Sequence, residues 1–227
     1  MAILPQSLRA LVPPRIRDEP HVRGVAVGLG VIPPRRMHSK QDMGVLLGAA
    51  VGAQRVVEIG VYEGASAVLL CEALGPRCEL HLVDPFGAHP DALPSGWGAT
   101  EWATRRVVER VVRRRGREAP GVRWHVALSH EVAASWSGGI DLVFIDGDHS
   151  EAGCELDWTS WCDHVAPGGH VVFHDARDGE PGGRGLPGPS AVVRRHFRDR
   201  ATEGWAIAAE ADRTVAVRRA RASATNG

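Results

Sequence analysis

The sequence predicts an α/β fold, in which one domain is built on a doubly wound, mostly parallel, Rossmann-like sheet of seven strands with an antiparallel edge strand. Three observations predict it. Five short, β-branched apolar runs alternate with helical stretches between residues 55 and 175, which is typical of parallel strands joined by helices. Two further runs close the chain and indicate a hairpin at the sheet edge. The 227 residues, 44% of them hydrophobic, are enough for one sizeable core.

The individual elements follow from local patterns. The first helix of the domain is expected to begin after Ser39, because Asp42 three residues later makes a variant of the capping box. Apolar runs predict the strands, and apolar residues three or four apart predict the helices. We expect strands at 55–61, 78–84, 122–128, 140–146, 169–175, 205–211 and 213–219, the last two joined at Ala211-Asp212. We expect helices from Ser39 onward, at 64–74 (ended by Gly75), 101–115, 130–136 and 150–165, and a short one ending near residue 199.

The remaining segments are expected to be irregular. Residues 1–37 carry two proline pairs and are predicted to form an N-terminal arm, residues 38–222 the domain, and residues 223–227 a tail. The loops at 85–99 and 176–190 follow strand ends. The glycine-rich second loop is interpreted as a lid, and the alternative is a disordered spacer. The arm also favours a homodimer.

Composition limits the classes of partner and the compartment. Equal numbers of basic and acidic residues, 27 of each, provide no global field for nucleic acid or a membrane surface. No apolar run reaches the length of a membrane span, and the N-terminus lacks the apolar core of a signal peptide. Four cysteines without a CxxC pair are expected to be free thiols in a reducing compartment. We therefore expect a soluble cytoplasmic protein.

Polar residues stand at the ends of the predicted strands, at the edge where ligands bind in such sheets. They are Glu58, Asp84, Ser129, Asp146 and Asp175.

The loop after the first strand suits a cationic nucleoside. Gly60 and Gly64 have GxxxG spacing rather than the GxGxxG of a diphosphate loop, and Glu58 just before them would repel phosphate. S-adenosyl-L-methionine (SAM) has no phosphate and carries an amino group and a sulfonium. Asp84, 24 residues after Gly60, fits a carboxylate that accepts the ribose hydroxyls. The alternative is a tight turn without a ligand.

Four stretches carry a family resemblance. "VVEIGVYEGASAVLL", "HLVDPFG", "IDLVFIDGDHSEAGCELDW" and "APGGHVVFHD" resemble the successive motifs of class I SAM-dependent methyltransferases. The most similar branch is that of small metal-dependent O-methyltransferases, which includes macrocin O-methyltransferase-like and cephalosporin hydroxylase-like proteins. The resemblance covers about residues 38–215 and leaves the arm and the 176–190 loop unassigned.

The resemblance implies a cofactor site. Glu58, Gly60 and Gly64, together with Ser66, would line the methionine end of SAM. Asp84 would hold the ribose with Phe86 beside the adenosine, Ser129 would face the adenine, and Asp146 would sit beneath the methyl donor.

The resemblance also implies a divalent cation. Asp146 matches the first metal ligand of catechol-type enzymes, and His174-Asp175 lies at the second ligand position. That second position departs from the Asp-Asn pattern, because Ala176 follows Asp175, so the third ligand stays open among His174, His149, Asp148 and water. Mg²⁺ is expected first, and an imidazole ligand would favour Mn²⁺ or another transition metal. The alternative is that both carboxylates only bind SAM and nearby amides.

A histidine stands where the catechol-type enzymes have their basic lysine. His149, three positions after Asp146, is therefore expected to act as general base, and the alternative is a solvent-facing residue at a helix start. His38 and Lys40 precede the first core helix and are interpreted as surface residues. The alternative, implied by the resemblance, is that they contact the substrate or SAM.

The predicted activity is SAM-dependent O-methylation of a hydroxyl on a small molecule such as a natural product or a sugar. One alternative is a SAM-binding regulatory or scaffold protein that does not methylate. A second is an NAD-dependent oxidoreductase, which the GxxxG loop and Glu58 argue against.

Overall fold

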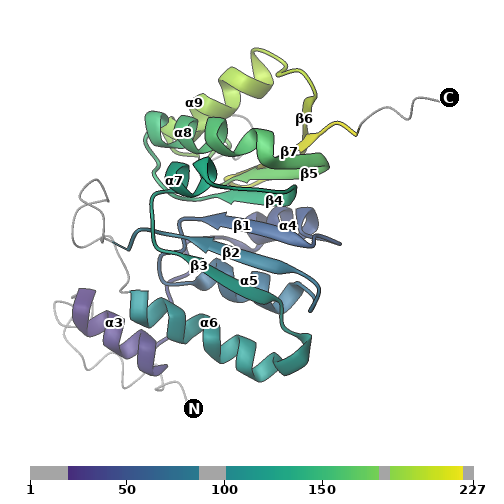
Figure 1. Cartoon of the computed structure of the whole chain (residues 1–227). Helices are drawn as coiled ribbons and strands as arrows, with labels where there is room; N and C mark the ends of the chain where they lie inside the picture. The colour runs from purple at the N-terminus through teal and green to yellow at the C-terminus, as the bar shows by residue number, and fades with distance from the viewer. Residues whose placement is uncertain (1–19, 87–100, 179–184, 222–227) are drawn as a thin grey trace.

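The structure is a computed structural model that describes residues 20–86, 101–178 and 185–221. Seven strands form one sheet in the order β3-β2-β1-β4-β5-β7-β6, with helices on both of its faces (Figure 1). The first five strands pair in parallel, and β7 pairs antiparallel with both β5 and β6, which confirms the predicted fold class. The strands are β1 (Arg55–Ile59), β2 (Glu79–Val83), β3 (Gly121–His125), β4 (Ile140–Ile145), β5 (Val165–Phe173), β6 (Trp205–Ala211) and β7 (Thr214–Arg219).

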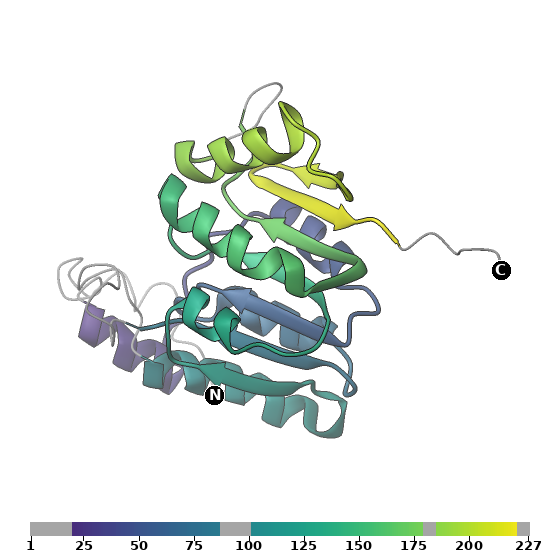
Figure 2. The same cartoon turned by 45° about the horizontal axis from the view of Figure 1, so that its top comes forward.

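The helices cover the sheet in two layers, as Figures 1 and 2 show. The described helices are α3 (Pro20–Leu29), α4 (Lys40–Ala49), α5 (Ala65–Ala73), α6 (Glu101–Arg115), α7 (Ser129–Ala134), α8 (Glu151–Trp161) and α9 (Pro187–Val193). Shorter helical turns lie at η1 (Gly116–Glu118), η2 (Cys162–His164) and η3 (Arg194–Arg198). Helices α4, α5 and α6 pack on one face, and α7, α8 and α9 pack on the other.

Each layer has its own buried core because the side chains of a strand alternate between faces. Leu70, Leu142 and Phe144 lie in the core under α4, α5 and α6. Trp161 and Phe173 lie in the core under α7, α8 and α9 and are fully buried. Full burial of a large apolar side chain stabilises a fold by about 1.5–3 kcal/mol.

The order of the strands reverses between β1 and β4. Along the chain, β1 is followed by β2 and then β3 on one side, whereas β4 and β5 lie on the other side. Ligands bind beyond the carboxyl ends of the strands at such a reversal. The register pairs Glu58 with Phe144, so the residues that follow β1 and β4 meet at this edge.

Several elements agree closely with the sequence. Ser39 caps α4 in a reciprocal capping box, in which its hydroxyl accepts from the Asp42 amide at 3.1 Å and its own amide donates to the Asp42 carboxylate at 2.9 Å. Helix α6 has the predicted bounds of 101–115. Both predictions depended on local patterns that the fold preserves.

The arm predicted as irregular contains a helix, which corrects that expectation. Helix α3 packs through Gly28 on α6, where a Cβ atom on Gly28 would lie 2.2 Å from the Trp102 ring. Arg110 donates to the carbonyl oxygens of Gly28 at 2.6 Å and Val27 at 2.9 Å, so it caps the end of the helix. Glycines lower the intrinsic helix propensity of this segment, and its support comes from a helix about 80 residues later in the chain.

Two loop predictions also change. Residues 187–190 of the predicted lid form the first turn of α9, which begins with Pro187 at a position that favours proline. The hairpin turn lies at Asp212-Arg213, with Asp212 at a φ of 47°, rather than at Ala211-Asp212. The remaining parts of the predicted loops at 87–99 and 179–184, together with the tail at 223–227, lie outside the described residues.

Within the described ranges, no helix combines the length and the apolar character that crossing a membrane requires.

Candidate functional site

The glycine loop lies directly on the end of β4. Gly60 has a φ of +84°, and a Cβ atom there would lie 2.2 Å from the backbone oxygen of Asp146. Gly64 has a φ of +82° and precedes the first turn of α5. At Gly60, only glycine tolerates both the left-handed conformation and the close approach to Asp146. This glycine therefore lets the loop after β1 lie directly against the end of β4.

Glu58 is a fully buried carboxylate beneath this loop. The Ser66 hydroxyl donates to its Oε1 atom, whereas Oε2 has no hydrogen-bond partner among the described residues. Burial raises the pKa of Glu58 to about 8, and the negative charges of Asp146 and Asp84 act in the same direction, against the hydrogen bond from Ser66. An unpaired buried oxygen of this kind is available to a donor on a ligand, above all a cationic one.

Asp84 holds the same loop through hydrogen bonds. Its Oδ2 atom accepts the amides of Val61 at 2.8 Å and Tyr62 at 2.9 Å, and its Oδ1 atom accepts the amide of Phe86 at 2.8 Å. A carboxylate has about four lone-pair sites, so roughly one site on Oδ1 is left for a ligand hydroxyl.

Ser129 turns its hydroxyl into the fold. It donates to the Asp157 carboxylate and accepts the Trp161 indole N–H at 3.0 Å, and both partners lie on α8. The structure therefore does not bring this hydroxyl together with the other predicted site residues.

Three imidazoles converge on Asp146, at the end of β4. His174 Nδ1 lies 2.8 Å and His149 Nε2 lies 3.3 Å from Asp146 Oδ1. His38 Nε2 lies 2.8 Å from the other oxygen, Oδ2. The side chains of His174 and His38 are 2% and 8% exposed, whereas that of His149 is 32% exposed, so His149 is the imidazole most accessible from solvent.

Two further carboxylates border this cluster. Asp175, with a φ of 50°, has its Oδ2 atom 3.5 Å from His174 Nδ1 and 3.7 Å from His149 Nε2. Its Oδ1 atom lies 2.9 Å from the Arg213 guanidinium. Asp42 Oδ2 lies 3.8 Å from His174 Nε2, which is too long for a hydrogen bond, so that contact is electrostatic.

The cluster balances its charges internally. Burial alone would raise the pKa of Asp146, but the charge of His174 and the hydrogen bonds from the three imidazoles hold it well below its usual range. Burial would lower the pKa of His174, but Asp146 and the neighbouring carboxylates raise it to about 10. The hydrogen bond to Asp146 raises the pKa of His149 against the effect of burial. The neighbouring carboxylates thus favour the protonated form of His174 and His149.

The donor atoms are close enough to share one cation. His149, His174 and Asp175 form one group whose ligand atoms lie within 4.8 Å of one another, and His38, Asp146 and His174 form an overlapping group. Imidazole nitrogens and carboxylate oxygens are both common metal ligands. The residues present therefore fit a divalent cation by their chemistry and their spacing.

The structure brings Asp146, His149, His174 and Asp175 together, in line with the sequence analysis. His38 was interpreted as a surface residue, and its burial against Asp146 corrects that interpretation. Asp42 was recognised only as a capping residue, yet it also accepts the Arg213 amide and the Thr214 hydroxyl at 2.9 Å each. The position of His38 just before a capped core helix could have indicated that it lies at the site. No local pattern in the sequence, in contrast, indicates that Asp42 contacts the start of β7.

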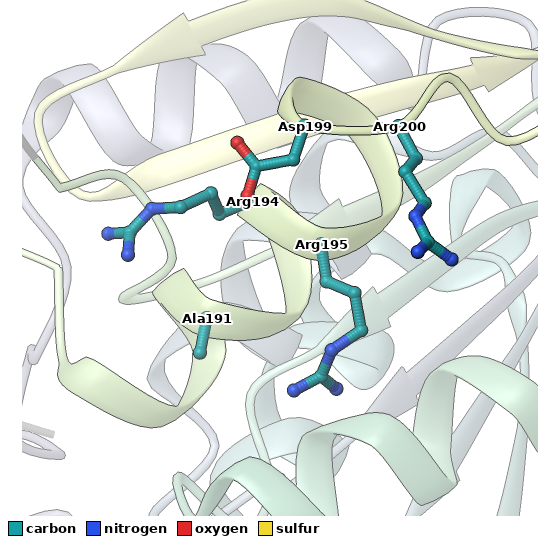
Figure 3. Close-up of a pocket in the computed structure, with 5 residues that line it drawn as sticks. All are labelled: Ala191, Arg194, Arg195, Asp199 and Arg200. Carbon is teal, nitrogen blue, oxygen red and sulfur yellow. The ribbon is translucent and has the colours of Figure 1, made fainter.

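A pocket of about 480 Å³ lies at a different place. It is lined by Ala191, Arg194, Arg195, Asp199 and Arg200, none of which is a predicted site residue. Figure 3 shows the three arginine side chains pointing in different directions rather than toward a common point. Arg194 and Arg195 already form ion pairs with acidic residues. Their positive charges are therefore compensated within the protein rather than offered to an anionic ligand.

Comparisons with known proteins identify the fold and the family. TomG, an O-methyltransferase from Streptomyces achromogenes involved in tomaymycin synthesis and solved with SAM, is 16% identical over 95% of each chain, with a TM-score of 0.55. The O-methyltransferase from Bacillus cereus, solved with SAH, is 14% identical over 94% of this chain and 96% of that chain, with a TM-score of 0.54. Cofactor-bound Rv0187 from MTB is 19% identical over 97% of this chain and 99% of that one, with a TM-score of 0.52.

These three likenesses concern the fold. A sequence model of the methyltransferase domain, in contrast, matches residues 57–176, which is more than half of the chain. The match contains the glycine loop and Asp146, His149, His174 and Asp175. The chain therefore belongs to the family of methyltransferase domains, enzymes of the transferase class, and it carries the Rossmann-like fold of its structural neighbours.

Proposed function

We propose that the protein is a SAM-dependent O-methyltransferase that acts on a hydroxyl of a small molecule, such as a natural product or a sugar. The observation that carries the proposal is the direct contact of the glycine loop with the end of β4, where Asp146 lies among three imidazoles. A nucleoside cofactor held by that loop would present its reactive group beside side chains that can orient and deprotonate a hydroxyl. The O-methyltransferases among the structural neighbours support the same choice.

The cofactor residues divide the work of binding. SAM, when bound, supplies a methyl group on a cationic sulfur. The unpaired Oε2 atom of Glu58 would accept the ammonium group of the methionine part, and Ser66 would orient Glu58. Gly60 and Gly64 would let the backbone approach that part closely. Asp84, with about one lone-pair site left, would accept one ribose hydroxyl rather than both. Phe86 beside the adenosine and Ser129 beside the adenine stay predictions.

The acceptor hydroxyl would be oriented at the Asp146 cluster. We propose that Asp146, His174 and Asp175 hold a divalent cation, which, when bound, lowers the pKa of a hydroxyl. An imidazole on Asp146 takes the proton, and His149 is the predicted one. Asp146 fixes the orientation of the ring by its hydrogen bond, and the partial exposure of His149 offers a route for the proton to solvent. Alignment of the hydroxyl with the methyl group would supply a large share of the rate enhancement.

The proposal is tested by calorimetry with S-adenosylhomocysteine (SAH), with NAD as the control ligand. We expect SAH to bind and NAD to give no heat, and the absence of heat with SAH would contradict the proposal. In Asp146→Asn we expect SAH binding to persist while methyl transfer to hydroxyl acceptors falls by roughly 100-fold or more. Binding of SAH without methylation across a broad panel of hydroxyl acceptors would favour the regulatory or scaffold alternative.

A further inference from the structure

We propose that the site takes a transition-metal divalent ion, such as Mn²⁺, Fe²⁺ or Zn²⁺, rather than Mg²⁺, and that His149 and His174 ligate it together with Asp146 and Asp175. This inference rests on the proposed function and names the class of its cation. It also changes the role of His149 from base to ligand. His38 is then the imidazole on Asp146 that stays outside the ligand set.

Four donor atoms form a ring with edges between 2.8 and 3.7 Å. From Asp146 Oδ1 the edges run 2.8 Å to His174 Nδ1 and 3.3 Å to His149 Nε2. From Asp175 Oδ2 they run 3.5 Å to His174 Nδ1 and 3.7 Å to His149 Nε2. Ligand bonds of about 2.1 Å place neighbouring donor atoms roughly 3.0–3.4 Å apart in octahedral or tetrahedral geometry. The observed edges bracket that range, and the donor atoms of His149, His174 and Asp175 lie within 4.8 Å of one another, as expected for ligands that share one ion.

The chemistry of the ring selects the class of ion. Two of the four donors are imidazole nitrogens, which suit zinc, iron and other transition metals. Mg²⁺ prefers hard oxygen ligands, demands near-ideal octahedral geometry and keeps several waters. Two of the four donors in the ring are nitrogens, which fit the preference of Mg²⁺ for oxygen poorly. The nitrogen content therefore favours the transition metals.

Outer contacts hold the ligands in place. Asp175 is fixed from behind by Arg213, 2.9 Å from its Oδ1 atom, and Asp146 by His38, 2.8 Å from its Oδ2 atom. Asp42 faces the far nitrogen of His174, which is the kind of carboxylate partner that orients ligating histidines. His174 itself is 2% exposed and is anchored to β4 by its amide, which donates to Ile145 at 3.0 Å. These contacts come from three separate parts of the chain: the start of α4, the end of β4 and the closing hairpin.

His38 provides a matched control. It is an imidazole on the same carboxylate, at the same 2.8 Å distance as His174, but it lies on Oδ2 and outside the ring. The overlapping group of His38, Asp146 and His174 is the competing choice of ligands for the ion. That choice includes His38 and leaves out Asp175. A comparison of His38 and His149 variants separates the two assignments.

The first experiment titrates the wild-type, metal-free chain with Co²⁺, Zn²⁺ or Mg²⁺ alone, by calorimetry and by the visible absorption of Co²⁺. We expect Co²⁺ and Zn²⁺ to bind at least about 100-fold more tightly than Mg²⁺, and Co²⁺ to show absorption bands of nitrogen ligation. An affinity for Mg²⁺ equal to that for Co²⁺, or a Co²⁺ spectrum of oxygen ligation alone, would overturn the inference. This measurement needs no variant to fold.

The second experiment compares three substitutions by the same Co²⁺ titration. His149→Asn and His174→Asn each remove a ligand and should weaken binding by more than about 100-fold, whereas His38→Asn removes only an outer contact and should weaken it by roughly 10-fold. Equal losses in His38→Asn and His149→Asn would overturn the ring assignment. SAH titrations run in parallel: SAH binding without a preference for transition metals refutes this inference alone, whereas failure of the wild-type chain to bind SAH refutes the proposed function.

Discussion

At the scale of single residues, the site depends on groups placed in costly environments. Glu58 is ionisable and wholly buried, Gly60 is held in a left-handed conformation, and Asp175 shares that conformation without being glycine. Burial of Glu58 and the left-handed backbone of Asp175 each cost free energy of folding unless a neighbour compensates, whereas glycine adopts the conformation of Gly60 at little cost. Residues of this kind cluster at functional sites, and their costs can be measured separately.

Glu58 should make the stability of the fold depend on pH. Burial raises its pKa from 4.5 to about 8, so between these values the folded state keeps a proton that the unfolded state has lost. Its contribution to stability is therefore present at low pH and is lost as the pH rises toward 8, with a limiting slope of about 1.4 kcal/mol per pH unit. Glu58→Gln cannot ionise and should show a shallower fall in urea unfolding between pH 5 and 8. Parallel curves for the two proteins would contradict this.

Gly60→Ala should destabilise the fold more than Gly52→Ala. Both glycines have positive φ, at +84° and +78°, but a Cβ atom at Gly60 meets the backbone of Asp146 whereas one at Gly52 meets nothing within 4 Å. We expect about 1 kcal/mol of conformational strain at Gly52 and at least about 3 kcal/mol at Gly60, where the clash is added. Urea unfolding measures both variants, and equal losses would show that the loop does not press on β4.

At the scale of elements, helix α3 is joined to the glycine loop by one buried ion pair. Glu63, in the loop, accepts hydrogen bonds from the Arg23 guanidinium at 2.5 and 2.7 Å and from the Arg35 amide at 2.6 Å. The side chains of Arg23 and Glu63 are 12% and 5% exposed. The segment that follows α3 leads to His38, so the same pair helps to hold that imidazole on Asp146.

Glu63→Gln should loosen this connection. Removing one charge leaves the Arg23 guanidinium mostly buried without its partner, and we expect a loss of about 2 kcal/mol in the free energy of unfolding. The control is Glu101→Gln, whose i,i+4 pair with Arg105 is 34–40% exposed and should contribute no more than about 0.5 kcal/mol. SAH affinity should fall in Glu63→Gln only. Equal effects of the two substitutions on stability and on SAH binding would argue against a specific role for the pair.

At the scale of the whole molecule, the candidate cation site joins distant parts of the chain. His38 precedes α4, Asp146 follows β4, and His174 and Asp175 follow β5, while Arg213 reaches Asp175 from the closing hairpin. Because its ligands are far apart in the sequence, the site is not formed in the unfolded chain, and an ion would bind only the folded state. Binding should therefore stabilise the entire fold rather than one segment.

A transition-metal ion should raise the melting temperature. At a free concentration of 100 times its dissociation constant, an ion that binds only the folded state adds about 2.7 kcal/mol. For a chain of this size the shift should be roughly 5–10 °C, because each kcal/mol moves the midpoint by about 2–4 °C. Thermal unfolding with Zn²⁺, with excess chelator and with the His174→Asn variant measures it. A shift of the same size in that variant would place the ion elsewhere.

Much of the architecture could be predicted because it is encoded locally. Alternating apolar runs and helical spacings indicated each of the seven strands, and the Ser39 and Asp42 pair indicated the start of α4. Parallel strands end at one edge, so Asp146, His149, His174 and Asp175 could be expected to meet there. Helix α3 escaped prediction because its stability comes from Trp102 and Arg110 of α6 rather than from its own propensity.

By itself, the sequence determined the order and type of the elements and the edge at which the polar strand ends gather, because periodicity and turn chemistry act within a few residues. Only the tertiary structure decided which groups meet there. It placed Asp42 on Arg213 and Thr214 from 171 and 172 residues away, brought His38 onto Asp146, and turned the Ser129 hydroxyl toward α8. Such partners depend on which surfaces pack together, and no local pattern specifies that.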